Sequence, residues 1–369
     1  MSPPADVVIL GGGIIGCALA EELARRGQRV CVVERGRIGA EASSAAAGIL
    51  SAQMDLSEPG SFFELCQAAR RLYPGWVQRI ERAARLSTEF RVRGLLYLAA
   101  TRSEGRAMAF RVRWQQRRGL RVERWSPSQI QRREPAVDGR FVAGFCFPTE
   151  AQLDNAVLMR ALAIACRRAG VDVREGVSVR RILQRGRAVT GVDTDHGAIR
   201  APVVVNCLGS WAAMSGRFPV RLPVEPARGQ ILVFRGPRRL LRRSVMSARA
   251  YMVQRRDGRL LVGSTVERAG FEKALTLEGM HHILCGVRRM SRAAARGTFV
   301  EAWAGLRPRT PDDLPILGTT PLGGLHIATG HFRHGILLAP ITATLMADLI
   351  LRGRASFDLT PFRPQRFRA

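Results

Sequence analysis

The chain has 369 residues, 46% of them hydrophobic, which is enough apolar material for a buried core spread over two or three lobes and excludes a disordered protein. Its formal net charge of +28 would suggest a polyanion partner. However, Lys273 is the only lysine among 58 basic residues and arginine occurs in every segment, which is typical of a coding bias, and we expect no nucleic-acid partner because no recognition signature is present.

Residues 5–36 have the pattern of a βαβ unit: a short apolar run, a glycine turn, an amphipathic helix pattern and a second apolar run that ends at Glu34. The glycines follow the spacing Gly11-x-Gly13-x-x-Gly16. The first permits a tight turn, the second lets backbone approach a pyrophosphate, and the third lets helix and strand pack closely. An acid about twenty residues later can accept hydrogen bonds from a ribose. The segment therefore predicts dinucleotide binding at a helix N-terminus.

Small and hydroxylated residues fill the next segment, GRIGAEASSAAAGIL, residues 36–50. Its backbone amides and the hydroxyls of Ser43 and Ser44 can close on a flat or phosphorylated ligand, but the same composition also suits a flexible connection. The apolar spacing that follows predicts a helix over residues 61–93, with its apolar positions in the core.

The middle of the chain alternates between helix and strand patterns. The sequence predicts helices over residues 103–119 and 154–169, with a turn at SPSQI, residues 126–130. We then expect a meander of short strands with turns at Arg185-Gly186 and His196-Gly197. The apolar strand over residues 203–207 ends in a glycine turn typical of buried parallel strands, so we expect it to return to the sheet of the first segment.

The last part of the chain changes character twice. Residues 220–304 are rich in strand patterns such as GQILVF, YMVQ, LLVGST and VEAWAG, which predict an antiparallel sheet in a second lobe. Residues 326–353 then have the pattern of a strand, a glycine turn and a long apolar helix. We expect this helix to begin near Gly335, because Pro340 is tolerated only close to the first turns.

The seven cysteines form an odd set without a CxxC pair or the spacing of a metal site. We therefore expect free thiols, no metal and a reducing, cytoplasmic environment. The first residues lack the basic and long apolar segments of a signal peptide, and no run reaches the roughly 18 uninterrupted apolar residues of a membrane span. We expect a soluble protein without a transmembrane segment.

Five motifs carry a resemblance to a known family: VVILGGGIIGCALAEELARRG with Glu34, SSAAAGIL, VVVNCLGSWA, WAGLRPRTPDDLPILG and ATGHFRHGILLAPITATLMADLI. They span nearly the whole chain, and the last two are the most specific. The sequence resembles the flavin-dependent amine oxidases of the D-amino-acid oxidase superfamily, and within it looks most like the glycine oxidases of the thiamine pathway. The resemblance implies an α/β fold with a discontinuous Rossmann-like FAD-binding domain, residues 1–88, 150–220 and 305–369, and an antiparallel-sheet substrate domain, residues 89–149 and 221–304.

The resemblance also implies a site for non-covalent FAD. Ile14, Ile15 and the turn glycines would hold the pyrophosphate, and Val179 would touch the adenine side. The segment His331 to Leu337 would lie against the flavin ring, with the positive end of the following helix facing the pyrimidine, where reduction leaves negative charge. The implied cofactor residues are Gly11, Gly13, Ile14, Ile15, Gly16, Glu34, Arg35, Ser43, Ser44, Ala46, Ala47, Gly48, Ile49, Val179, His331, Phe332, Arg333, His334, Gly335, Ile336 and Leu337.

A small amino acid is the substrate that the resemblance implies. Arg307 in GLRP would bind its carboxylate with a planar, two-pronged guanidinium that lysine cannot replace, assisted by Tyr251 and Arg333. Val266 stands where a family member has methionine, and Arg309 where it has glycine, so the pocket volume and the charge beside Arg307 differ. No cysteine follows Cys285, which disfavours the covalent thioether flavin of related sarcosine oxidases.

The implied reaction is oxidation of glycine, sarcosine or a short D-amino acid to an imine, with dioxygen as the electron acceptor, supplying thiazole synthesis. Hydride transfer needs no protein base, and the sequence offers no convincing triad or metal cluster. We interpret His281 and His282 as ordinary helix or loop residues far from any motif. Asp312 and Asp313 have the pattern of turn formers before a proline.

Two alternatives stay open. A D-amino-acid dehydrogenase that passes electrons to a quinone would use the same arginine, and its basic surface would help it dock to anionic lipid. A non-catalytic polyanion-binding protein would give Arg307 and Tyr251 no role. The resemblance further implies a homo-oligomer, with a tetramer as its expected form.

Overall fold

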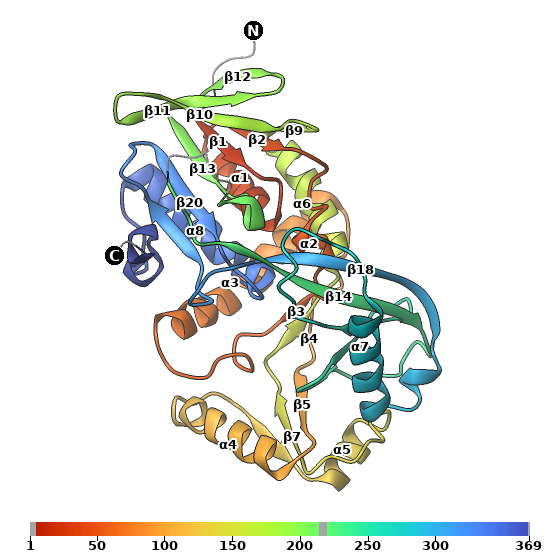
Figure 1. Cartoon of the computed structure of the whole chain (residues 1–369). Helices are drawn as coiled ribbons and strands as arrows, with labels where there is room; N and C mark the ends of the chain where they lie inside the picture. Colours follow the sequence, from red (N-terminus) through yellow and green to blue (C-terminus); the bar gives the residue numbers. More distant parts are fainter. Residues whose placement is uncertain (1–4, 214–219, 368–369) are drawn as a thin grey trace.

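A six-stranded, mostly parallel sheet organises one half of the molecule (Figure 1). The computed structural model describes residues 5–213 and 220–367. In spatial order the strands are β19 (Ile316–Thr319), β20 (Leu325–Thr329), β13 (Val203–Asn206), β1 (Val7–Leu10), β2 (Val30–Glu34) and β9 (Asp172–Glu175). Only the β19–β20 pair is antiparallel. The predicted return of residues 203–207 to the first sheet is confirmed, because β13 lies between β1 and β20.

The two faces of this sheet have different covers. Alternate residues of a strand point to opposite faces, so Val7 and Ile9 pack against helices while Val8 and Leu10 pack on the other side. The helices are α1 (Ile14–Arg25), α3 (Ser61–Ala84), α6 (Asn155–Arg168) and α8 (Gly335–Arg352). The other face is covered by the meander β10 (Val179–Arg185), β11 (Ala188–Thr194) and β12 (Gly197–Arg200), whose two predicted turns are confirmed.

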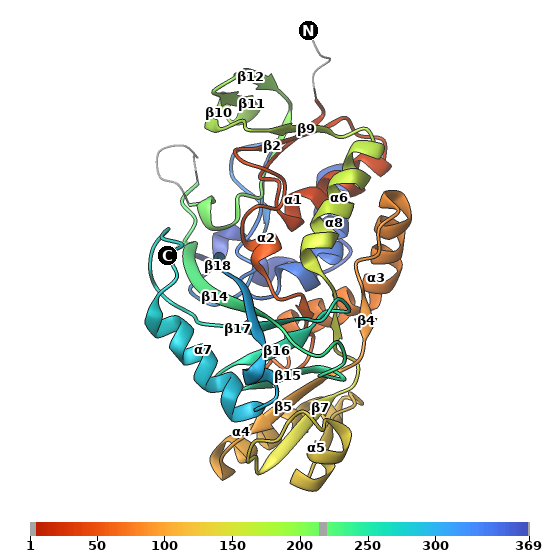
Figure 2. The same ribbon diagram turned by 90° about the vertical axis from the view of Figure 1, so that its right-hand side faces the viewer.

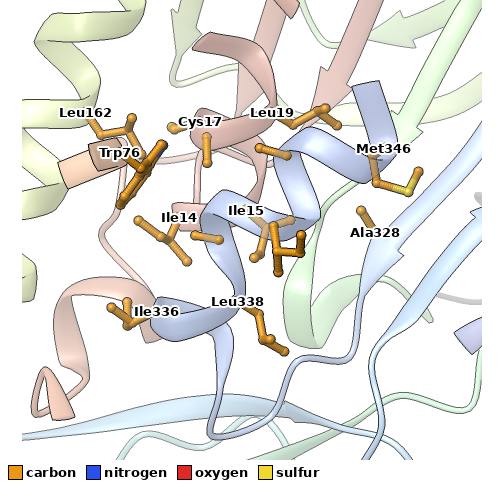
Figure 3. Packing of buried hydrophobic residues seen from close by; sticks show 14 of the residues in the cluster. Ile14, Ile15, Cys17, Leu19, Trp76, Leu162, Ala328, Ile336, Leu338 and Met346 are labelled. Atoms are coloured by element: carbon orange, nitrogen blue, oxygen red, sulfur yellow. The ribbon is translucent and has the colours of Figure 1, made fainter. Parts of the chain in front are cut away.

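Helices α1 and α8 meet in the centre of the larger core. Figure 3 shows Ile15 and Leu19 of α1 close to Leu338 and Met346 of α8, with Trp76 from α3 nearby. Among the helices of the described ranges, α8 alone is long and apolar enough to cross a membrane by length and composition, but 67% of it is buried inside the protein. Burial against α1 and the sheet is the position of a core helix.

A second, eight-stranded sheet forms the other half, with the order β18 (Thr298–Arg309), β14 (Glu225–Arg235), β17 (Arg259–Gly263), β16 (Tyr251–Gln254), β15 (Ser244–Ser247), β5 (Leu95–Ala99), β7 (Ala143–Phe147) and β6 (Glu123–Trp125). It is antiparallel as predicted, except that β5 and β15, which come from two separate segments of the chain, run parallel. Helices α4 (Arg102–Arg117), α5 (Pro127–Arg133) and α7 (Leu277–Met290) pack on it. Figure 2 shows α4 and α5 at the end opposite to β10–β12.

A small sheet of β3 (Ile49–Leu50), β8 (Ala151–Gln152) and β4 (Arg91–Val92) joins the two halves where the chain passes between them. The remaining short elements are α2 (Ala42–Ala45) and the 3-10 turns Gly209–Trp211, Ala294–Arg296, Thr360–Phe362 and Pro364–Phe367.

Two predicted elements were wrong in extent or type. The helix predicted over residues 61–93 ends at Ala84, because Arg85 takes a left-handed conformation (φ 55°) and Glu81 accepts hydrogen bonds from Thr88. The turn predicted at SPSQI is the start of α5. Its Ser126 and Gln129 cap each other's backbone, a signal for a helix N-terminus that the sequence contained.

The cysteines form no disulfide bond in the structure. All seven cysteines lie in the described part of the chain and are free. In the same part, no cluster of three or more histidine, cysteine, aspartate or glutamate side chains could hold a metal ion.

Candidate functional site

A cavity of about 470 Å³ lies between the two halves of the molecule. One wall comes from the carboxyl ends of β1, β2, β13 and β20, which is where open parallel sheets place their ligands. The opposite wall comes from β14, β16, β17 and β18 of the larger sheet. Residues far apart in the sequence, from the first glycine turn to the loop before α8, therefore line one cavity.

The glycine turn between β1 and α1 is packed as its spacing predicts. Gly11 has φ 101°, and a Cβ there would lie 2.6 Å from the carbonyl oxygen of Cys207. A Cβ on Gly16 would lie 2.0 Å from the carbonyl oxygen of Gly11. Gly16 therefore serves close helix–strand packing and does not line the cavity, whereas Gly11 and Gly13 do.

Glu34 lines the cavity at the end of β2, and it also holds the glycine turn. Its carboxylate accepts hydrogen bonds from the backbone N–H of Gly12 (2.7 Å) and of Gly36 (2.9 Å). Each carboxylate oxygen has a further lone pair for a ligand hydroxyl. Arg35 and Val179 line the same end of the cavity.

The small-residue loop closes on the N-terminus of α1. The Ser43 hydroxyl accepts a hydrogen bond from Ile14 N–H (2.9 Å), and the Asn155 side chain donates to the carbonyls of Ser43 (2.7 Å) and Ser44 (2.9 Å). Ser43, Ala46, Ala47, Gly48 and Ile49 line the cavity. The Ser44 prediction has less support, because this residue is not part of the cavity wall.

Buried Arg255 supports the same loop from the other half of the molecule. It donates to the carbonyls of Leu153 (2.6 Å) and Ala47 (2.9 Å) and to Oδ1 of Asn155 (3.2 Å). Asn155 and Arg255 are not among the residues predicted from the sequence. Nothing in the sequence distinguishes Arg255 from the other arginines, because its role depends on contacts between segments a hundred or more residues apart.

The segment before α8 presents two buried imidazoles. His331 shares a 3.1 Å hydrogen bond with Thr342, and burial lowers its pKa to about 3. His334 lines the cavity, burial lowers its pKa, and neither of its ring nitrogens has a partner among the described residues. Both rings are therefore neutral at ordinary pH. Residues His331 to Leu337, predicted to lie against a flavin ring, all line the cavity next to the unpaired N–H groups of the α8 N-terminus.

Arg307 lies within β18, and its side chain reaches the cavity beside Gly229 of β14. Its guanidinium donates to Thr265 O (3.0 Å) and Ser264 Oγ (2.8 Å), both neutral acceptors. A Cβ on Gly229 of β14 would lie 2.3 Å from the guanidinium nitrogens, so only glycine leaves room for the side chain. Burial lowers the pKa of Arg307, but a guanidinium stays charged. Within residues 5–213 and 220–367 no acid forms an ion pair with it, although Glu267 acts on its pKa from a greater distance.

Tyr251 and Arg333 line the same region as Arg307. A Cβ on Gly263 would lie 2.5 Å from the Tyr251 hydroxyl, so this ring also depends on a neighbouring glycine. Burial raises the pKa of Tyr251, with Arg307 and Arg333 acting in the opposite direction. The Arg333 guanidinium lies 5.0 Å from the centre of the Phe332 ring. The structure thus brings together the three residues predicted to bind substrate.

Arg309 does not add charge to the cavity as its sequence position suggested. It pairs with Asp313 (2.7 Å), lies 5.4 Å from the centre of the Phe332 ring, and is absent from the cavity wall. Asp312 pairs with Arg366 (2.8 Å). The two acids are turn formers, as predicted, and Asp313 has φ 58°.

A charged and aromatic cluster crosses from one half to the other at the Glu34 end of the cavity. Glu41 pairs with Arg35 (3.0 Å) and with Lys273 (3.0 Å), which lies in the loop between β17 and α7. The Trp211 ring lies 3.9 Å from the Arg35 guanidinium and 5.4 Å from the Phe271 ring. We call these five residues the Glu41 cluster, and they attach the β17–α7 loop beside the cavity.

His282 was interpreted as an ordinary helix or loop residue far from any sequence motif. It lies on α7 and lines the cavity together with Arg249. Its neighbour His281 contacts Cys285 (3.4 Å) and is absent from the cavity wall. A single histidine on an amphipathic helix carries no sequence signal for a cavity that other elements complete.

Comparison with known proteins agrees with this geometry. The family model described as "FAD dependent oxidoreductase" matches residues 6–349. The chain belongs to this family. It is 34% identical over 361 residues to a glycine oxidase of Geobacillus kaustophilus, covering 97% of this chain and 96% of the relative. The crystal structure of glycine oxidase from that organism superimposes with a TM-score of 0.96 at 32% identity, covering 99% of this chain and 100% of that one.

A longer relative is the "Bifunctional protein ThiO/ThiG" of Synechocystis, which is 36% identical over 373 residues and covers all of this chain. The chain spans 55% of the length of that relative. The protein is therefore an FAD-binding member of the family. Its cavity fits FAD because the glycine turn, the Glu34 carboxylate and the two unpartnered nitrogens of His334 line one continuous wall with the α8 N-terminus.

Proposed function

We propose that the protein is an oxidase of glycine and other small amino acids that uses dioxygen as electron acceptor. The observation that carries this proposal is the charge of Arg307, held in the cavity by neutral partners only. A buried cation without an acid partner is costly, and a substrate carboxylate would neutralise it with two parallel hydrogen bonds. The net reaction is glycine, dioxygen and water giving glyoxylate, ammonia and hydrogen peroxide.

The proposed roles of the residues follow from their places in the cavity. Arg307 binds the carboxylate with two hydrogen bonds, and Tyr251 donates a further one from its hydroxyl, which stays protonated because burial raises its pKa. Bound FAD supplies the two-electron oxidation of the carbon–nitrogen bond. The neutral, buried imidazoles of His331 and His334 contribute shape and hydrogen bonds rather than a base, since their pKa values are lowered. Orientation by these side chains is the main contribution of the protein.

The domain division that we propose assigns residues 1–88, 150–220 and 305–369 to FAD and residues 89–149 and 221–304 to the substrate. It is supported by the sheets, because the described strands of the six-stranded sheet all lie in the first set. β18 crosses the boundary at residue 305, which places Arg307 at the junction. Residues 1–4, 214–219 and 368–369 of the first set lie outside the described residues.

A supply of oxidised glycine to thiazole synthesis is the cellular role that we propose, in the cytoplasm and as a homo-oligomer. The similarity to a relative named for a combined ThiO/ThiG protein supports this role. Size-exclusion chromatography with light scattering measures the assembly.

The test is peroxide release by the FAD-bound protein with glycine, sarcosine, D-alanine and D-proline, compared with turnover on an artificial quinone. Arg307→Lys should keep its FAD and lose on the order of 100-fold in kcat/KM for glycine, because one ammonium cannot make the two parallel bonds. Arg309→Gly is the matched control, since Arg309 pairs with Asp313 outside the cavity. Turnover with a quinone but not with oxygen would instead identify a dehydrogenase, and FAD binding without amino-acid turnover would reject the proposal.

A further inference from the structure

The cavity wall carries a cationic side chain, Arg249, that has no role in the proposed oxidation of glycine. Arg249 lines the cavity, is exposed to it, and its guanidinium makes no ion pair or ring contact within residues 5–213 and 220–367. Arg249 lies two residues before Tyr251, in the turn between β15 and β16.

The backbone of Arg249 is held in place by a tight hairpin turn. Residues 248–250 join β15 to β16, and Ser247 N–H donates to Ala250 O (2.8 Å). The Ser247 hydroxyl accepts hydrogen bonds from the backbone N–H of Arg249 (3.3 Å) and Ala250 (3.3 Å). The turn that presents Arg249 is thus continuous with the strand that presents Tyr251, and both side chains enter one cavity.

Helix α7 packs on this turn and adds an imidazole. A Cβ on Gly286 would lie 2.7 Å from Cβ of Ala250 and 3.3 Å from Cβ of Arg249, so the helix is in close contact with the turn. His282 is four residues earlier, on the same side of the helix, and also lines the cavity. The wall beside Arg249 therefore offers a second hydrogen-bonding side chain.

The acids that line the cavity do not balance Arg249. Glu34 is bonded to the backbone of the glycine turn, and Glu41 pairs with Arg35 and Lys273. Asp55 acts on the pKa of His334, beside the loop that precedes α8. All three belong to the first 88 residues, whereas Arg249 and His282 belong to the opposite wall. None of the acids that line the cavity therefore pairs with Arg249, and a bound anion would supply the missing negative charge.

We propose that Arg249 and His282 form a second anion site, so that the enzyme oxidises small amino acids that carry a second carboxylate, such as D-aspartate and D-glutamate. The proposal rests on the oxidase function proposed above, with Arg307 binding the α-carboxylate. A guanidinium binds the second carboxylate with two parallel hydrogen bonds, which a neutral amide of equal shape cannot match. For D-aspartate the balanced reaction with dioxygen and water gives oxaloacetate, ammonia and hydrogen peroxide.

The experiment compares isosteric substrates. We expect kcat/KM to be on the order of 10-fold higher for D-aspartate than for D-asparagine, and for D-glutamate than for D-glutamine. Arg249→Gln should bring both ratios to about one, and Arg249→Lys should restore part of them. Arg239→Gln is the control, because Arg239 is an exposed arginine outside the cavity whose loss should leave the ratios unchanged.

Three results would overturn the second anion site. The unaltered protein could oxidise the amides as well as the acids, or Arg249→Gln could leave the acid-to-amide ratios of kcat/KM unchanged. The preference for the acids could also vanish at high salt, which would indicate long-range electrostatic attraction alone. If the FAD-bound protein oxidises none of these compounds, nor glycine, the oxidase proposal itself fails. In that case the absorption spectrum of the bound flavin is titrated with succinate and acetate. Succinate binding that Arg249→Gln does not weaken then rejects the anion site independently.

Discussion

Replacing Gly229 with alanine should displace the Arg307 guanidinium and thereby lower the activity with glycine. The new Cβ would lie 2.3 Å from both Arg307 nitrogens and 2.4 Å from their carbon, whereas ordinary contacts begin at 3.4 Å. The guanidinium must therefore retreat by roughly 1 Å, away from its acceptors on Ser264 and Thr265. The atoms that move are the end of a flexible side chain, so the protein should still fold.

A displacement of about 1 Å at an orienting group can cost about 100-fold in rate, or about 2.7 kcal/mol of transition-state stabilisation. We expect this loss in kcat/KM for glycine, measured by peroxide release, with the flavin absorbance per protein unchanged. Gly236→Ala is the matched control, because Gly236 directly follows the same strand and a Cβ there meets nothing within 4 Å. Wild-type kcat/KM in Gly229→Ala at full FAD occupancy would refute the assignment of Arg307.

The other predictions concern cofactor retention and stability. Lys273→Ala should release FAD up to about 5-fold faster, since an exposed ion pair contributes at most about 1 kcal/mol. Stopped-flow measurement of the loss of bound flavin gives this rate. The control is Arg268→Ala, which removes an exposed side chain from the same loop. Arg255→Met should lower the free energy of unfolding by about 3 kcal/mol, because the carbonyls of Ala47 and Leu153 lose their hydrogen-bond donor, and it should also lower the flavin occupancy. Urea titration measures the free energy of unfolding. The same change at exposed Arg256 should leave that free energy nearly unchanged. Burial lowers the pKa of His326 from 6.5 to about 4. The unfolded chain therefore takes up a proton first as the pH falls, and the free energy of unfolding should drop by about 1.4 kcal/mol per pH unit between these values. His326→Leu should remove that part of the slope, and an unchanged slope would contradict the buried, neutral imidazole.

The sequence by itself determined the parts of this protein that depend on local patterns. The glycine spacing predicted a turn in which backbone carbonyls leave no room for a side chain at Gly11 or Gly16. The apolar periodicities placed α6 and the start of α8 to within a residue or two. The family motifs identified Arg307, because its meaning lay in its position within GLRP rather than in its charge. These signals are short in range, so the residues that carry them are neighbours in the chain.

Tertiary structure alone decided which other residues complete the cavity. Arg255, Asn155 and Gly229 contact residues far away in sequence, and His282 lines the cavity from α7. Nothing in their residue types marks them, because arginine and glycine occur throughout this chain. Arg309 and Arg249 make the same point in opposite directions. The first appeared to add charge to the site but is neutralised by Asp313, while the second had no distinguishing pattern and is placed in the cavity by the packing of α7 on a hairpin turn. The sequence shows which residues are charged, but the fold decides which of them are paired with an opposite charge.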